Sequence, residues 1–134
     1  MDIGDDTLAA KAKVLLEQVA SDTDPFLQLW AAGLLATAPL DTLRDPAFAL
    51  EVANKLDTIA DYAQDPDYAE LLAAALAANG QYAKAVISER EAIHRAARLH
   101  WNTTPLMPRL AKYEAGQQWR GYLCDCDALS GTEY

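Results

Sequence analysis

Hydrophobic residues recur along the chain with the spacing of an α-helix. Residues 7–20 place one apolar stripe behind Asp5 or Asp6, either of which can cap a helix. Residues 25–37 are apolar on most faces, which is typical of a helix packed between other elements. The pattern therefore predicts two helices in the first part of the chain. The stripe of the first helix consists of Leu8, Ala12, Leu15, Leu16 and Val19.

The same periodicity continues through four further segments, and no segment alternates as a half-buried strand does. Asn79 and Gly80 end one of these segments, because both residues tolerate the left-handed backbone of a helix end. We therefore predict an all-α protein of about six helices in a single domain, residues 1–120, followed by a C-terminal tail, residues 117–134. The four further helices are expected at residues 46–62, 66–78, 81–99 and 105–115.

Four steps of a capping residue followed by proline mark the expected helix starts. An aspartate or threonine side chain accepts a free backbone N–H, and proline fits the first turn, where a missing N–H costs nothing. We expect a helix to begin at each step. The steps are Asp24-Pro25, Asp45-Pro46, Asp65-Pro66 and Thr104-Pro105.

Composition supports this picture and excludes some classes of partner. The 134 residues are enough for one domain with its own core, and the hydrophobic share of 51% contains many alanines, the best helix formers. A net charge of −9 argues against binding to nucleic acid or to an anionic membrane surface. Neither a signal peptide nor an apolar run of membrane-spanning length is visible, so we expect a cytoplasmic protein.

Small residues in the segment 66–99 occupy positions where two helices would approach closely. Ala85 and Ala92 are two helical turns apart and share a face, so a neighbouring helix can come near. Gly80 permits a tight reversal before them, and Tyr82 can wedge against that turn. The segment is therefore expected to form an antiparallel helix pair.

This segment resembles a tetratricopeptide repeat, a unit of about 34 residues made of two antiparallel helices. Ala69, Glu89 and Ala97 depart from the family pattern, which has tryptophan, an aromatic residue and proline at those positions. The resemblance rests on Leu72, Ala73, Leu76, Gly80, Tyr82, Ala85 and Ala92.

A degenerate copy of the unit is visible upstream, in residues 25–62. Aligning the two segments places Ala49 at Ala85 and Leu56 at Ala92. The long connection between the two helices of this copy is similar to that of a bacterial subgroup of these repeats. Residues 5–20 would then cover one end of the array and residues 105–116 would cap the other, because terminal helices of a solenoid need a polar outer face.

The resemblance implies a protein–protein interaction module, an adaptor, scaffold or chaperone-like protein, that binds a peptide or helix in the groove lined by the first helix of each pair. In the clearer repeat the groove positions would be Asp67, Glu70, Ala74, Ala77 and Ala78. Such a groove would be shallow and partly acidic, and would suit a basic or apolar segment. We expect charge reversal at Glu70 to weaken that binding.

Candidate catalytic chemistry is sparse. Cys124 and Cys126 are weak candidates for a soft metal, since a closed zinc site needs four ligands and an internal disulfide across one residue would be strained. His94 and His100 lie in a basic stretch with three arginines, and no serine or cysteine motif that could supply a nucleophile lies near them. A solvated or intrachain-paired helix face is therefore favoured over a docking patch for an acidic partner. We predict neither an enzyme nor a cofactor.

Three tryptophans leave further possibilities open. Trp30 is expected in the core and Trp119 against the last helix, although each could instead anchor a partner. One alternative function is self-assembly, or capping of a larger scaffold, through Trp101, Trp119 and the apolar tail. A second is a small metal- or redox-active protein that uses Cys124 and Cys126.

Overall fold

The computed structural model shows an all-helical chain. It describes residues 2–20, 24–38, 41–58, 64–121 and 123, and in these residues there is no strand. A short 3₁₀ helix, η2 (Thr104–Leu106), precedes the last α-helix. The α-helices are α1 (Asp2–Ala20), α2 (Pro25–Thr37), α3 (Pro46–Leu56), α4 (Pro66–Ala78), α5 (Tyr82–Arg98) and α6 (Met107–Glu114).

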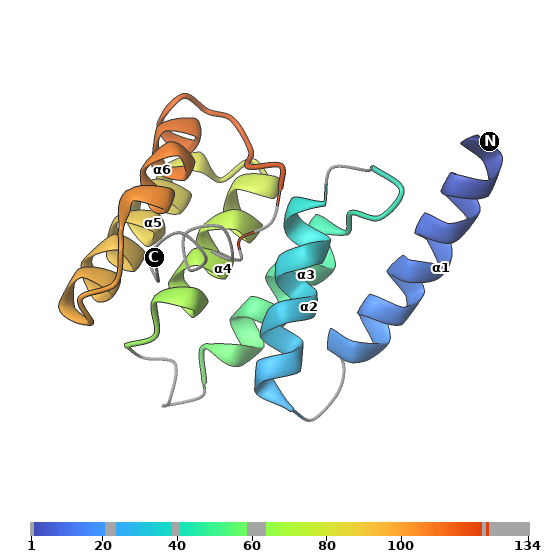
Figure 1. Cartoon of the computed structure of the whole chain (residues 1–134), viewed down its shortest axis with the longest axis horizontal. Helices are drawn as coiled ribbons and strands as arrows, with labels where there is room; N and C mark the ends of the chain where they lie inside the picture. Colours follow the sequence, from blue (N-terminus) through green and yellow to red (C-terminus); the bar gives the residue numbers. More distant parts are fainter. Residues whose placement is uncertain (1, 21–23, 39–40, 59–63, 122, 124–134) are drawn as a thin grey trace, which may run out of the picture.

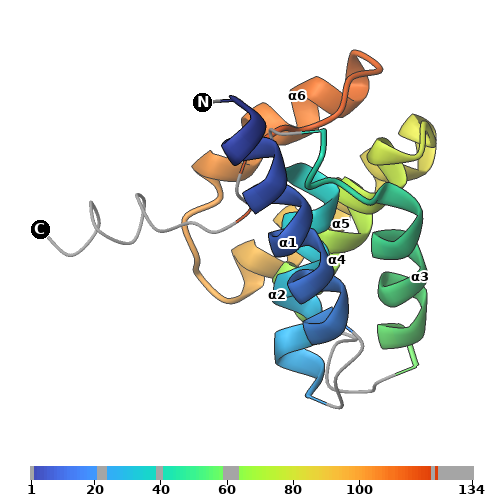
Figure 2. The ribbon, with the colours of Figure 1, turned by 90° about the vertical axis from the view of Figure 1, so that its right-hand side faces the viewer.

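The helices stand in a row that follows the sequence from α1 to α6 (Figure 1). Each α-helix packs against the next, including α5 against α6, and α2 also packs against α4. Figure 2 looks along this row from the α1 end, with α1 in front of α2 and α3 to one side of both. No helix of the described residues is both long and apolar enough to cross a membrane.

Two of the predicted caps are confirmed by their hydrogen bonds. Asp45 accepts the backbone N–H of Phe48 at 3.3 Å, and Asp65 accepts that of Asp67 at 2.8 Å. Thr104 behaves differently, because it is the first residue of η2 and its own N–H donates to the side chain of Asn102 at 3.1 Å. The predicted cap at Thr104 is therefore wrong, and α6 begins two residues later than expected.

The reversal between α4 and α5 uses the glycine that the sequence placed there. Gly80 has a φ of +79°, a conformation that L residues with a side chain rarely adopt. The N–H of Gln81 then donates to the carbonyl of Leu76 at 2.9 Å, which satisfies one of the free carbonyls at the end of α4. Gly80 is required for its backbone angle, because a β-carbon there would meet nothing within 4 Å.

Small residues bring α4 and α5 together, as expected. Ala73, Ala85 and Ala92 are fully buried, and the Ser88 hydroxyl donates to the carbonyl of Ala69 at 2.8 Å across the interface. Leu76 is also buried, whereas Leu72 and Tyr82 are half-buried at the edge of the core. In the upstream segment the aligned residues are buried too, with Ala49 at 0% and Leu56 at 1% exposure.

Several boundaries differ from the sequence prediction. α1 begins at Asp2 and therefore extends one turn further back than expected, and α3 ends at Leu56. The rest of the helix predicted up to residue 62 falls partly on residues 59–63, which lie outside the described part of the chain. The first residues of the expected tail, up to Leu123, pack against the hydrophobic core rather than extending from it.

Candidate binding surfaces

The five residues that the resemblance places in a groove lie on α4, but they do not form an open groove. Asp67 is exposed and Ala78 is half-buried, whereas Glu70, Ala74 and Ala77 are at most 5% exposed. Arg109 pairs with Glu70, and Ala77 lies in a cluster with Tyr113 and Trp119, whereas Ala74 belongs to the core shared with α2 and α3. The expected accessibility of Glu70, Ala74 and Ala77 is thus wrong for this conformation, and the part of all five in partner binding stays a prediction.

A buried ion pair joins α6 to the covered face of α4. Arg109 donates to the Glu70 carboxylate, and the two side chains are only 5% and 6% exposed. The guanidinium carbon of Arg109 also lies over the ring of Trp119, 5.6 Å from its centre. Arg109 therefore fixes both α6 and Trp119 to α4, which confirms the prediction that Trp119 packs against the last helix.

Glu89 of α5 lies beside this ion pair and is fully buried. Burial first, and then the proximity of the Glu70 carboxylate, raise the pKa of Glu89 to about 10, against a smaller opposing effect of Arg109. Burial likewise raises the pKa of Tyr113 above its usual range. The raised pKa favours the protonated form of Glu89, which leaves Glu70 as the carboxylate that pairs with Arg109.

The segment after α6 runs back across the row of helices (Figure 1). We call residues 117–121 and 123 the C-terminal segment. Arg120 forms an ion pair with Asp41 at 2.9 Å, and the Gly121 N–H donates to the carbonyl of Thr37 at 2.8 Å. Leu123 then packs beside Gly33, one turn before Thr37 on α2. The segment therefore follows α2 from its C-terminal end toward its middle.

Two exposed apolar side chains lie on α2 on the N-terminal side of Gly33, beyond the point that Leu123 reaches. Trp30 is 55% exposed and Leu27 is 39% exposed, although Gln28, Leu29 and the residues from Ala31 to Gly33 are buried. Trp30 lies one turn before Gly33 and so shares its side of the helix. The expectation that Trp30 belongs to the core is wrong, because that side of α2 is left uncovered by the other described residues.

A second surface is an open cleft of about 500 Å³ on α4 and α5. Leu72 and Leu76 contribute its apolar floor, and Ile87, which is 68% exposed, stands at its edge. Lys84 lines the cleft near one end and Arg95 lies about three helical turns further along α5. An apolar lining with charged ends can accept an amphipathic segment, and the cleft is open to solvent.

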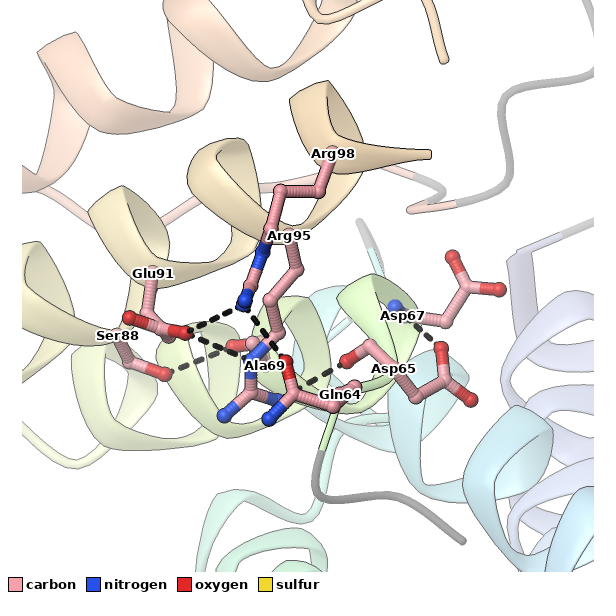
Figure 3. Close-up of polar contacts among 8 residues, drawn as sticks. All are labelled: Gln64, Asp65, Asp67, Ala69, Ser88, Glu91, Arg95 and Arg98. Atoms are coloured by element: carbon pink, nitrogen blue, oxygen red, sulfur yellow. Dashed lines mark hydrogen bonds and ion pairs between the residues drawn. The ribbon is translucent and has the colours of Figure 1, made fainter. Parts of the chain in front are cut away.

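Polar contacts surround Arg95, which lines one end of the cleft (Figure 3). Arg95 donates to Glu91 at 2.9 Å and to the backbone carbonyl of Asp65 at 3.2 Å, and Arg98 donates to the side chain of Gln64 at 2.6 Å. These bonds tie α5 to the start of α4. The basic stretch on α5 is consequently an intrachain-paired face, which was the favoured interpretation, and the i, i+4 pair of Glu91 with Arg95 is confirmed.

Candidate metal chemistry is not visible in the described residues. They contain no group of three or more His, Cys, Asp or Glu side chains that could hold a metal ion. Cys124 and Cys126 lie outside the described residues, so the structure gives no information on their roles. His94 and His100 are both exposed on or just after α5.

Comparison with known proteins adds no family to this picture. No family model, no curated protein and no solved structure matches the chain.

Sequence reasoning missed the residues that hold the C-terminal segment, chiefly Gly33, Thr37, Asp41 and Arg109. One signal was present, since Gly33 interrupts a helix of strong helix formers and an isolated glycine in a helix can mark a close approach. The contact of Gly121 with Thr37 joins residues 84 positions apart, and no spacing rule predicts such a contact.

Proposed function

We propose that this chain is a protein–protein interaction module that binds an extended segment of a partner along α2 and α4. In this proposal α2–α3 and α4–α5 are two tetratricopeptide-like helix pairs, and α6 caps the array. The order of packing and the burial of Ala49, Leu56, Ala85 and Ala92 at corresponding positions support such a repeat.

The exposure of Trp30 is the observation that carries the proposal. A tryptophan that is 55% exposed on a largely buried helix leaves a large apolar surface in water. Tryptophan is enriched among the residues that dominate binding energy at protein interfaces. With Leu27 it extends a surface that already holds an extended stretch of polypeptide, the C-terminal segment.

The charge of this surface indicates the chemistry of the partner. Asp41, after the end of α2, and Asp67, in the first turn of α4, are both exposed, and the whole chain carries a net charge of −9. A basic partner segment would be attracted by these carboxylates, and apolar side chains would pack on Trp30 and Leu27. We propose a basic and apolar segment, as the resemblance implied.

The proposal can be tested by selecting peptides from a displayed random library on the immobilised full-length protein. Selected peptides should lose affinity by at least about tenfold when Trp30→Ala replaces the wild type, because truncation of a central aromatic anchor costs more than 1–2 kcal/mol. Fluorescence anisotropy with labelled peptides measures the change. Circular dichroism should show unchanged helix content in the variant, since Trp30 is largely outside the core.

The matched control is Trp101→Ala, which truncates another exposed tryptophan, 48% exposed, after the end of α5. This variant should bind the same peptides as the wild type. A selection that yields no binding peptide would contradict the proposal, as would peptides that bind Trp30→Ala unchanged. Peptides that instead lose affinity with Ile87→Asp would place binding in the cleft on α4 and α5.

One observation favours self-assembly as a second candidate function. Leu99, Trp101 and Met107 are each about half exposed around the connection between α5 and α6. Trp119 does not belong to this patch, because it packs against Arg109. A native mass that shows a dimer at micromolar concentration for the wild type, and a monomer for Trp101→Ala, would support self-assembly through this patch.

A further inference from the structure

The C-terminal segment has the properties of a bound peptide. We infer that the surface it occupies recognises an extended partner segment with an aromatic residue, a basic residue, two further residues and an aliphatic residue, and that the chain's own copy, Trp119 to Leu123, competes for this surface. The inference rests on the proposed function, because it names the sequence that the proposed binding face would accept.

The aromatic position is set by small residues on α4. Trp119 packs against the cluster that contains Ala73 and Ala77, whose side chains leave room for a large ring. Arg109 lies under the other part of this site, 5.6 Å from the ring centre, and adds a cation–π contact. An aliphatic side chain would lose that contact, so an aromatic residue is favoured.

The basic position is set by Asp41, on the connection between α2 and α3. The carboxylate of Asp41 receives the guanidinium of Arg120 at 2.9 Å, and its side chain is 83% exposed. Because the aspartate is fixed near the end of α2 and open to solvent, a basic side chain of a partner can take the place of Arg120. An acidic side chain there would be repelled.

The aliphatic position is set by Gly33 of α2. A β-carbon on Gly33 would lie 3.6 Å from a methyl carbon of Leu123, so the glycine leaves room beside the leucine side chain. Leu123 also packs against the main hydrophobic cluster, which includes Leu29, Ala32 and Leu71. The position therefore accepts a side chain of the size of leucine.

A backbone hydrogen bond fixes the direction of the bound segment. The carbonyl of Thr37 belongs to the last turn of α2, where carbonyls have no partner within the helix, and it accepts the N–H of Gly121. Gly121 has a φ of +136°, which L residues with a side chain rarely adopt, so glycine is favoured at this position of a partner segment. The bond from Gly121 to Thr37 is the one backbone hydrogen bond between the C-terminal segment and α2 to α5 in the described residues, so local release of the segment should cost less than unfolding a helix.

The test uses a labelled peptide with the sequence of residues 117–123, QQWRGYL, and the full-length protein. In the variant Gly121→Pro the chain's own segment loses the N–H that reaches Thr37, and the φ of +136° at this position is closed to proline. The peptide should bind this variant at least about tenfold more tightly than the wild type, because a tethered competitor acts at an effective concentration in the millimolar range. Fluorescence anisotropy gives both affinities.

A second variant, Arg120→Glu, weakens the same segment by placing a like charge at Asp41, and it should also bind the peptide more tightly than the wild type. Two control peptides carry alanine for the tryptophan or glutamate for the arginine. The first should bind Gly121→Pro at least about tenfold more weakly, as expected for loss of an anchor residue. The second should bind more weakly by a smaller factor, because the ion pair with Asp41 is exposed to solvent.

Equal affinity of the peptide for the wild type and both variants would overturn the inference, as would no binding to any of them or equal binding of the control peptides. The proposed function fails separately, since it depends on Trp30 and on peptides selected without regard to this sequence. If the selected peptides require Trp30 but the QQWRGYL peptide binds neither the wild type nor the variants, the inference is refuted and the proposed function is not.

Discussion

Arg109 of α6 and Glu70 of α4 form an ion pair that is almost fully removed from solvent. The pair joins α6 to the face of α4 on which the resemblance places a groove. It also supports Trp119, which packs over the guanidinium. The packing of α6 and Trp119 against α4 thus involves a contact between residues 39 positions apart.

Removing one member of this pair should be strongly destabilising. In Arg109→Met the Glu70 carboxylate keeps its buried position without its cation, and we expect the free energy of unfolding to fall by about 3–5 kcal/mol. Urea denaturation followed by circular dichroism measures the change. Charge reversal at Glu70 should act in the same way, so it tests folding and cannot test groove binding.

The double variant Glu70→Met with Arg109→Met provides the control. Replacing both charges with apolar side chains of similar length leaves no unpaired ion. The double variant should therefore lose less free energy of unfolding than the two single variants lose together. Additive losses would show that the two side chains do not interact in the folded protein.

Glu89→Gln should stabilise the protein at neutral pH. The pKa of Glu89 is raised to about 10 in the folded state, so between the ordinary pKa of 4.5 and pH 10 the folded protein holds a proton that the unfolded chain has released. The free energy of unfolding should therefore decrease as the pH rises through this range. Glutamine keeps the shape and a donor without this penalty, and we expect a gain on the order of 3 kcal/mol at pH 7.

The pH profile distinguishes this effect from a change in packing. The variant should be more stable than the wild type at pH 7 but about equal to it near pH 4, where both states of the wild type carry the proton. Glu91→Gln, on an exposed part of the same helix, is the control and should show no such gain. A stability difference for Glu89→Gln that is independent of pH would contradict the buried, protonated state.

Gly33→Ala should be tolerated and modestly stabilising. The added β-carbon would sit 3.6 Å from Leu123, which is an ordinary contact, and alanine is favoured over glycine inside a helix by about 1 kcal/mol. Gly33→Phe should instead push Leu123 away, and amide hydrogen exchange at Gly121 should then accelerate. A destabilised Gly33→Ala would mean that the C-terminal segment lies closer to α2 than the structure places it.

Tyr68→Phe should reduce the free energy of unfolding by about 1 kcal/mol. The Tyr68 hydroxyl donates to the carbonyl of Ala53 at 2.9 Å and so links α4 to α3. Burial raises the pKa of Tyr68 to about 12, so in the wild type the hydroxyl keeps its proton throughout the neutral range. An unchanged urea midpoint would show that the hydrogen bond contributes nothing to stability.

Local sequence signals predicted the helices well, because each depends on residues close together in the chain. Asp45 and Asp65 cap α3 and α4 within three residues of themselves, and Gly80 turns the chain at its own position. The alanines of α5 face α4 because helical geometry alone sets their common side.

The burial of Glu70 and the exposure of Trp30 could not be predicted in this way. The sequence indicates an exposed acid at Glu70, whereas the folded chain pairs it with Arg109, far along the chain. Glu89 is buried at a position where the resemblance expects an aromatic residue. Trp30 was expected in the core because α2 is apolar on most faces, and composition does not tell which face remains without a neighbour.

Backbone amide chemical shifts of the full-length protein, recorded while a library-selected peptide is added, test the central claim most directly. If the chain binds an extended segment along α2, the largest changes should fall on Leu27, Trp30, Gly33 and Thr37, with smaller ones at Gly121. Largest changes around Ile87 in the cleft, or around Trp101 after α5, would contradict the assignment of this face as the binding site.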